Sequence, residues 1–88
     1  MVHSSHADVV NRLKRAQGHI KTIIEMIEAK RECLDVAQQL HAIEKAIQNA
    51  KKLYIHDHID NCLEDIAGSA TRDARNSLAE FKEIAKYL

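Results

Sequence analysis

The 88-residue sequence contains no proline and no tryptophan, and it has only two glycines, two tyrosines and one phenylalanine. Without proline, and with so little glycine, few positions would interrupt a helix, and the shortage of aromatic residues disfavours a β-sheet core. The composition therefore predicts an all-α fold. A chain of this length forms a single domain, here residues 1–88, and buries a limited fraction of its surface by itself, so we expect a partner chain to add stability.

Long hydrophobic runs are also missing. The first residues carry no apolar run of the kind found in a signal peptide, and no segment is apolar for the roughly 18 residues that a membrane span needs. We therefore expect a cytoplasmic protein that does not enter a membrane. In that reducing compartment the two cysteines, Cys33 and Cys62, are better interpreted as metal ligands or reactive thiolates than as a disulfide.

Apolar residues recur every three or four positions in three segments, which predicts helices at about residues 7–29, 33–66 and 71–87. The apolar face of the first helix consists of Val10, Leu13, Ile20, Ile24 and Ile27. The second helix carries the series Val36, Leu40, Ile43, Ile47, Ala50 and Tyr54, which then shifts by one position to Ile55, Ile59, Cys62 and Ile66. The third helix repeats Leu78, Phe81, Ala85 and Leu88. Gly68 is suited to ending the second helix, and Ser69 or Thr71 to capping the third.

The predicted second helix has a consequence for assembly. At about 1.5 Å per residue it would be roughly 50 Å long, which is more than the other helices of so small a domain can cover. Its apolar stripe is therefore expected to pack against another chain. A line of small residues, Ala42, Ala46 and Ala50, would let two copies approach closely, although the helix preference of alanine explains the same residues equally well.

His58 and Cys62 lie four positions apart, so they project from the same face of the second helix. Such a pair can chelate a borderline or soft metal ion, whereas a lone cysteine in an apolar stripe is a common core residue. Cys33 lies about 37 Å from His58 along a continuous helix, so these residues cannot meet within one chain. If two copies pair antiparallel about residue 46 or 47, Cys33 of one falls beside residue 60 of the other, and a symmetric dimer holds two such sites.

The remaining histidines, His19, His41 and His56, are interpreted as helix-surface or polar core residues. Hydrogen bonding to a ligand is the alternative for His19 and His41, whereas His56 points to a different face from His58. No nucleophile, base and orienting group occur at usable spacing, so we do not expect an enzyme.

The net charge is zero with neutral histidines, but the charges are segregated along the chain. Residues 11–21 contain no acid, and residues 56–65 contain no lysine or arginine. The candidate DNA-binding residues are Arg12, Lys14, Arg15 and Lys21 in the first group and Lys45, Lys51 and Lys52 in a second. An ordinary charged helix surface would look similar. With so few aromatics to stack on bases, duplex DNA is a better partner than single strands.

Cys33, His58 and Cys62 at this spacing, together with RLKRAQGH at residues 12–19 and ECLDVAQQLHAIEKAI at residues 32–47, resemble the CsoR/RcnR family of metal-responsive repressors over essentially the whole chain. The resemblance implies a three-helix protomer with a long central helix, paired through antiparallel second helices and assembled as a disc-shaped homotetramer without a helix-turn-helix. It implies that the metal-free protein binds operator DNA before an efflux gene and that the effector weakens this complex. A metal-storage or chaperone protein would explain the ligands but not the basic segment.

Within this family the effector differs between members. Formaldehyde sensors are implied to need a proline after the initiator Met, where this chain has Val2, and persulfide sensors to lack the histidine at His58. Copper(I) sensors share the three ligands but typically carry an aromatic residue before the first cysteine, where this chain has Glu32, which we expect to lie in the second shell beside Cys33.

Nickel and cobalt sensors of the family add a ligand from the N-terminal segment. Here His3 is the candidate, with His6 and the amine of Val2 as further donors. The segments IEMIEAKREC and EFKEIAKYL look most like the nickel/cobalt efflux regulators of the DmeR type. The expected order of effectors is therefore Ni(II) or Co(II) first, Cu(I) second and Zn(II) third.

Overall fold

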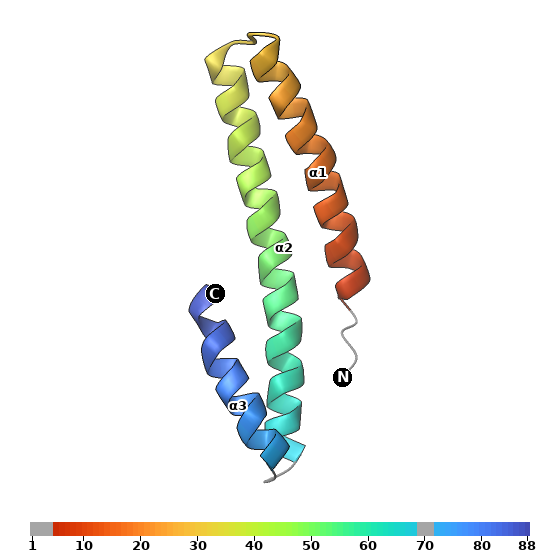
Figure 1. Cartoon of the computed structure of the whole chain (residues 1–88), viewed down its shortest axis with the longest axis vertical. Coiled ribbons are helices and arrows are strands. Elements are labelled where there is room, and N and C mark those ends of the chain that lie inside the picture. Colours follow the sequence, from red (N-terminus) through yellow and green to blue (C-terminus); the bar gives the residue numbers. More distant parts are fainter. Residues whose placement is uncertain (1–4, 69–71) are drawn as a thin grey trace. The chain divides into compact units, whose positions relative to one another are not determined.

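The computed structural model describes residues 5–68 and 72–88, with side chains for residues 5–60 and 75–88. Three α-helices follow one another along the chain: α1 (His6–Glu28), α2 (Cys33–Gly68) and α3 (Arg72–Ile84) (Figure 1). A short 3-10 helix, η1 (Ala85–Tyr87), completes the C-terminus. The predicted all-α class with a long central helix is confirmed. The observed α2 extends to Gly68 instead of residue 66, and η1 replaces the last turn expected of the third helix.

The chain forms two compact units. The first, Ala7–Lys51, contains α1 and the first half of α2, and the second combines Met1–His6 with Lys52–Leu88. In the first unit α1 and α2 lie side by side and run in opposite directions, and in the second α3 turns back along the end of α2 (Figure 1).

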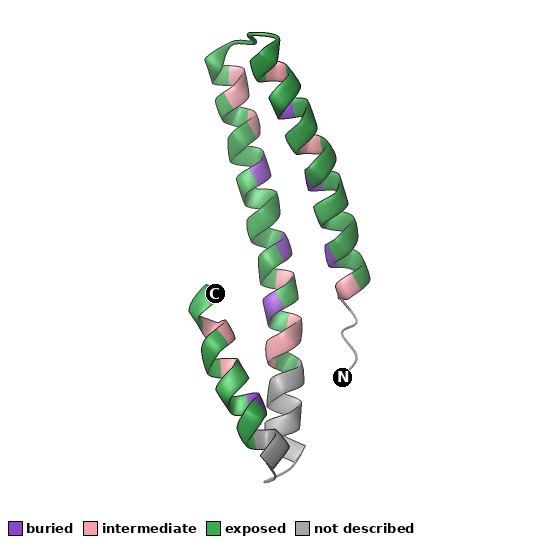
Figure 2. Cartoon of the chain, in the orientation of Figure 1, coloured by how far each residue is buried: buried purple, intermediate pink, exposed green. Residues whose placement is uncertain are grey.

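The core of the first unit is narrow. Ala16 and Ile23 of α1 meet Ile43 of α2, and Val36 packs against them. Within this unit the buried residues are seven positions apart, at Val9, Ala16 and Ile23 on α1 and at Ile43 and Ala50 on α2 (Figure 2). A seven-residue repeat of this kind is typical of coiled-coil packing, in which one thin line of each helix faces its neighbour.

The apolar face that the sequence shows on α1 is not the face that contacts α2. Its five residues are 42% to 54% exposed, because the inward line is the adjacent one through Ala16. In α2, the residues of the predicted apolar series differ in exposure: Ile43 is buried, whereas Leu40 and Ile47 are exposed. In α3, Leu78 is exposed while Phe81 is half-buried. None of the helices in the described segments is both long and apolar enough to cross a membrane.

The alanine line of α2 is divided: Ala42 and Ala46 are exposed, whereas Ala50 is buried, and its role between two copies stays a prediction. Ala50 is only 2% exposed within this chain. Ala46 lines a groove together with side chains from α1. Leu34, Leu40 and Ile47 are exposed large apolar residues of this half of the helix, so a second copy could cover them.

The turn between α1 and α2 ends the first helix in a specific way. The N–H of Arg31 donates to the carbonyl of Met26 and the N–H of Lys30 to that of Ile27, both at 3.0 Å, which is the hydrogen-bond pattern of a Schellman motif. Lys30 has a φ of 58°, in the left-handed region that glycine adopts most readily. The N–H of Val36 then donates to the carbonyl of Glu32, so Cys33 lies in the first turn of α2.

Candidate metal and nucleic-acid sites

Cys33 presents an exposed thiol that is not part of a disulfide. It borders an apolar hollow of about 480 Å³ at the turn between α1 and α2. The other lining residues are Ile27, Lys30, Arg31, Val36, Ala37 and Leu40. Glu32, which is expected to lie beside Cys33 in the second shell, directly precedes α2 and is exposed. An exposed thiol at the start of a helix is accessible to a ligand or to a residue from another chain.

His58 lies in the second unit, where its side chain is only 12% exposed. Its Nε2 atom is 2.9 Å from Oε1 of Glu80 on α3, a contact that is ionic when the imidazole is protonated. Cys62 follows His58 by four positions on the same helix, and its side chain lies outside the described residues. Glu80 thus places a carboxylate oxygen next to one nitrogen of the imidazole.

Glu80 is not among the residues that the sequence pattern indicated. A signal for it was present, because two antiparallel helices joined by a short connection place positions at similar distances from that connection beside each other. His58 is 10 positions before the last residue of α2, and Glu80 is 8 positions after the first residue of α3. Pairing across the hairpin, added to the helix prediction, could have found this contact.

His6 begins α1, and its imidazole stacks on the ring of Tyr54, with centroids 5.1 Å apart. Tyr54 precedes His58 by four positions on α2, which is about one helical turn. The start of α1 is therefore held beside the part of α2 that carries His58. The other two N-terminal candidates, Val2 and His3, lie outside the described residues.

Among the side chains that the structure describes, no three His, Cys, Asp or Glu residues come together in a group that could hold a metal ion. Cys33 and His58 belong to different units, and α2 runs unbroken over the 25 positions between them. The donors themselves suit a transition metal, since thiolate and imidazole bind the borderline and soft ions from nickel to copper(I).

Two of the remaining histidines, His41 and His56, are exposed on α2. His19 is half-buried, and its Nε2 atom lies 2.7 Å from Oε1 of Gln39. This contact joins α1 to α2 within the first unit. His19 is thus a polar residue at the edge of the core, which is one of the two interpretations that its sequence position allowed.

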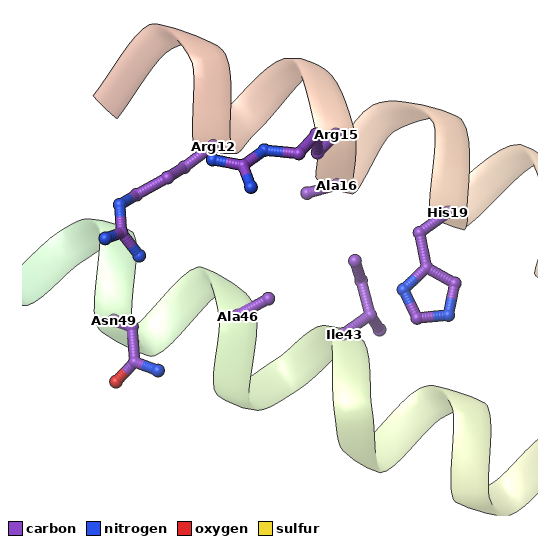
Figure 3. A pocket seen from close by; sticks show the side chains of 7 residues that line it. All are labelled: Arg12, Arg15, Ala16, His19, Ile43, Ala46 and Asn49. Atoms are coloured by element: carbon purple, nitrogen blue, oxygen red, sulfur yellow. The ribbon is translucent and has the colours of Figure 1, made fainter. Parts of the chain in front are cut away.

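The candidate DNA-binding residues are all exposed: Arg12, Lys14, Arg15 and Lys21 on α1, and Lys45, Lys51 and Lys52 on α2. Two of them line a groove of about 250 Å³ between α1 and α2 (Figure 3). The groove is bordered by Arg12, Arg15, Ala16, His19, Ile43, Ala46 and Asn49. Arg12 is also 3.4 Å from Asp8, an exposed pair that contributes little to stability. The groove therefore presents two guanidinium groups at one opening.

The chain matches the family model described as "Metal-sensitive transcriptional repressor" over residues 5–88. It is 36% identical over 80 residues to the copper-sensing transcriptional repressor CsoR of Mycobacterium ulcerans, covering 89% of this chain and 65% of the relative. It is 31% identical over 78 residues to the copper-sensing repressor CsoR of Bacillus subtilis, covering 89% of this chain and 75% of the relative. The chain thus spans slightly less than two thirds of the Mycobacterium ulcerans protein.

A solved structure with the same fold is that of the nickel-responsive transcriptional regulator InrS. The two chains superpose with a TM-score of 0.84 at 30% sequence identity, and the match covers 99% of this chain and 96% of the other. The similar proteins thus include both copper-sensing and nickel-responsive regulators.

Proposed function

Because the chain belongs to the family of metal-sensitive transcriptional repressors, which are not enzymes, we propose that it represses transcription by binding operator DNA in its metal-free form and releases the DNA when a transition metal binds. The observation that carries the proposal is the family match over residues 5–88, which includes a thiol and an imidazole on α2 and the basic residues of α1. The regulated gene is an efflux gene, and the repressor acts in the cytoplasm.

The metal site is shared by two copies of the chain. Two α2 helices pair antiparallel about residue 46 or 47, and Cys33 of one copy binds the metal together with His58 and Cys62 of the second. Exposed Leu40 and Ile47 support this pairing, since they leave apolar area for the second helix to cover. Two such dimers form the homotetramer.

Nickel or cobalt is the proposed effector, as in DmeR-type regulators, with His3 as an additional ligand and His6 and the amine of Val2 as further donors. Two observations support this choice: the similarity to nickel-responsive InrS, and the stack of His6 on Tyr54, which holds the start of α1 near His58. Copper(I) is the second candidate, because the curated relatives are copper-sensing repressors, and Zn(II) is the third.

The side chains around the ligands have supporting roles. A metal-binding histidine commonly donates its second ring N–H to a carboxylate, which sets the tautomer and the ring orientation. The distance of 2.9 Å between Glu80 and Nε2 of His58 supports this role for Glu80, in which case Nδ1 would be the nitrogen available to a metal. Glu32, which directly precedes Cys33, lies beside the metal ligands without binding the metal itself.

The seven basic residues contact DNA phosphates, and in a tetramer their contributions add, so affinity falls steeply with salt. A bound metal would connect Cys33 of one copy to His58 and Cys62 of the second. Because Cys33 begins α2 directly after the turn from α1, a displacement of Cys33 moves α1 and turns its arginines away from the phosphates. Coupling of this kind is typically about 1–3 kcal/mol and is reciprocal, so DNA weakens metal binding by the same factor.

The test is an anaerobic titration of the metal-free protein with Ni(II), Co(II), Cu(I) and Zn(II). Absorption spectra report coordination, and release of a labelled duplex, selected by the protein from a random-sequence pool, reports the response. We expect Ni(II) or Co(II) to release the duplex from the unmodified protein and from the control His41→Ala, but not from Cys33→Ala.

Three outcomes would count against parts of the proposal. If Cys33→Ala binds DNA and is still released by metal, the shared site is wrong. If His3→Ala leaves nickel and cobalt affinity unchanged, the N-terminal ligand is wrong and copper(I) becomes the better candidate. If the protein binds metal but selects no duplex, it is a storage protein or metal chaperone.

A further inference from the structure

His19 and Gln39 form a directional contact between the two helices of the first unit. Nε2 of His19 donates to Oε1 of Gln39 at 2.7 Å, although the residues are 20 positions apart in sequence. Both side chains are half-buried. His19 also lines the groove between α1 and α2 that Arg12 and Arg15 border (Figure 3).

The apolar packing alone does not fix how α1 is rotated about its own axis. Burial of apolar area is non-directional, and α1 carries neighbouring apolar lines with the same seven-residue period. One line ends in Ile23, which is 3% exposed, and a neighbouring line, Leu13, Ile20 and Ile27, is 42% to 54% exposed. A roll of α1 by about 40°, the angle between positions four apart on a helix, would exchange these two lines. The hydrogen bond between His19 and Gln39 distinguishes between the two orientations, because the roll would move the two side chains apart.

The same rotation determines where the arginines point. Arg12, Arg15 and His19 are spaced three and four positions apart, so they lie on one side of α1. All three border the same groove, opposite Ile43 and Asn49 of α2 (Figure 3). A roll that breaks the hydrogen bond to Gln39 would therefore carry both guanidinium groups away from this groove.

We infer that His19 and Gln39 are a positioning pair that holds Arg12 and Arg15 in the orientation in which they bind DNA phosphates. This inference rests on the proposed DNA-binding function and adds to it two polar side chains that are not themselves required to touch DNA. The pair acts by fixing the orientation of α1 about its own axis. Its contribution is therefore measured by the number of DNA phosphates that Arg12 and Arg15 neutralise.

The experiment compares the metal-free unmodified protein with His19→Ala, Gln39→Ala and the double variant. The probe is the duplex that the unmodified protein selects from a random-sequence pool. Each single variant is expected to weaken binding about 5- to 10-fold, and the double variant to be no weaker than the worse single one. The slope of log affinity against log salt should become shallower by about 0.9 for each phosphate that the arginines no longer neutralise. His41→Ala, an exposed histidine of α2, is the matched control and should change neither quantity.

A conservative variant separates positioning from general stability. In His19→Gln an amide N–H replaces the imidazole donor, so the salt slope and the affinity should return toward those of the unmodified protein. Additive effects of the two alanine substitutions, or weaker binding with an unchanged salt slope, would overturn the positioning role. If the unmodified protein selects no duplex, the proposed function fails and this inference fails with it. If it does, and His19→Ala binds equally well, only the inference fails.

Discussion

The imidazole of His6 and the phenol ring of Tyr54 are stacked, with centroids 5.1 Å apart and planes inclined by 8°. The two residues are 48 positions apart in sequence and belong to different helices, α1 and α2. Tyr54 lies about one turn before His58. The stack therefore holds His6, the first residue of α1, close to one proposed metal ligand.

Replacing Tyr54 tests whether this stack supports the N-terminal ligand. Aromatic pairs contribute about 0.5–1.5 kcal/mol beyond their buried area, so Tyr54→Ala should weaken Ni(II) binding by about 2- to 10-fold. Tyr54→Phe keeps the ring and should bind Ni(II) like the unmodified protein. Competition titrations with a chelator measure both. Equal nickel affinity for Tyr54→Ala would show that the stack does not contribute to the site.

The contact between Glu80 and His58 gives a second prediction. If Glu80 orients the imidazole, Glu80→Gln should lower metal affinity by about 10- to 100-fold, which is the usual effect of removing an outer-shell partner. The control is Glu83→Gln, an exposed carboxylate of α3 that pairs only with Lys86 among the described interactions. A metal affinity that rises in Glu80→Gln would instead mean that Glu80 competes with the metal for Nε2.

Pairing through α2 predicts that one charge in its exposed apolar line prevents assembly. Ile47 is 43% exposed in the single chain, near the proposed two-fold axis. Ile47→Glu should bury an unpaired carboxylate in the dimer, which is costly, and should shift the protein to monomers in sedimentation experiments. Gln38→Glu, at an exposed position on a different side of α2, should leave the oligomer intact. A dimer that tolerates Ile47→Glu would place the interface elsewhere.

The turn before Cys33 offers a prediction about stability. Lys30 has a left-handed backbone with a φ of 58°, so Lys30→Gly should raise the free energy of unfolding by about 1 kcal/mol, because glycine has no Cβ to clash in this conformation. Lys30→Ala keeps a Cβ and should bring no such gain. Urea unfolding at equal protein concentration compares the three proteins, and equal midpoints for all of them would contradict the expected strain at this residue.

Local properties of the sequence determined the helices. The absence of proline and the spacing of apolar residues by three or four positions predict the start of α2 at Cys33 and its long continuous run, because helix formation depends on neighbours within one or two turns. The same periodicity places His58 and Cys62 on one helix face. Their meeting with Cys33 of a second copy stays a prediction, since it depends on two chains.

The tertiary structure decided which of several equivalent lines on each helix faces the other. In α1 the sequence shows a broad apolar face through Ile24, yet the buried line passes through Ile23 and the small Ala16. Hydrophobicity does not distinguish these neighbouring lines, because burial is proportional to apolar area and has no direction. Two polar contacts also depend on the tertiary structure: His19 with Gln39, and His58 with Glu80. Each joins residues of two different helices, so the packing of those helices determines it and local spacing does not.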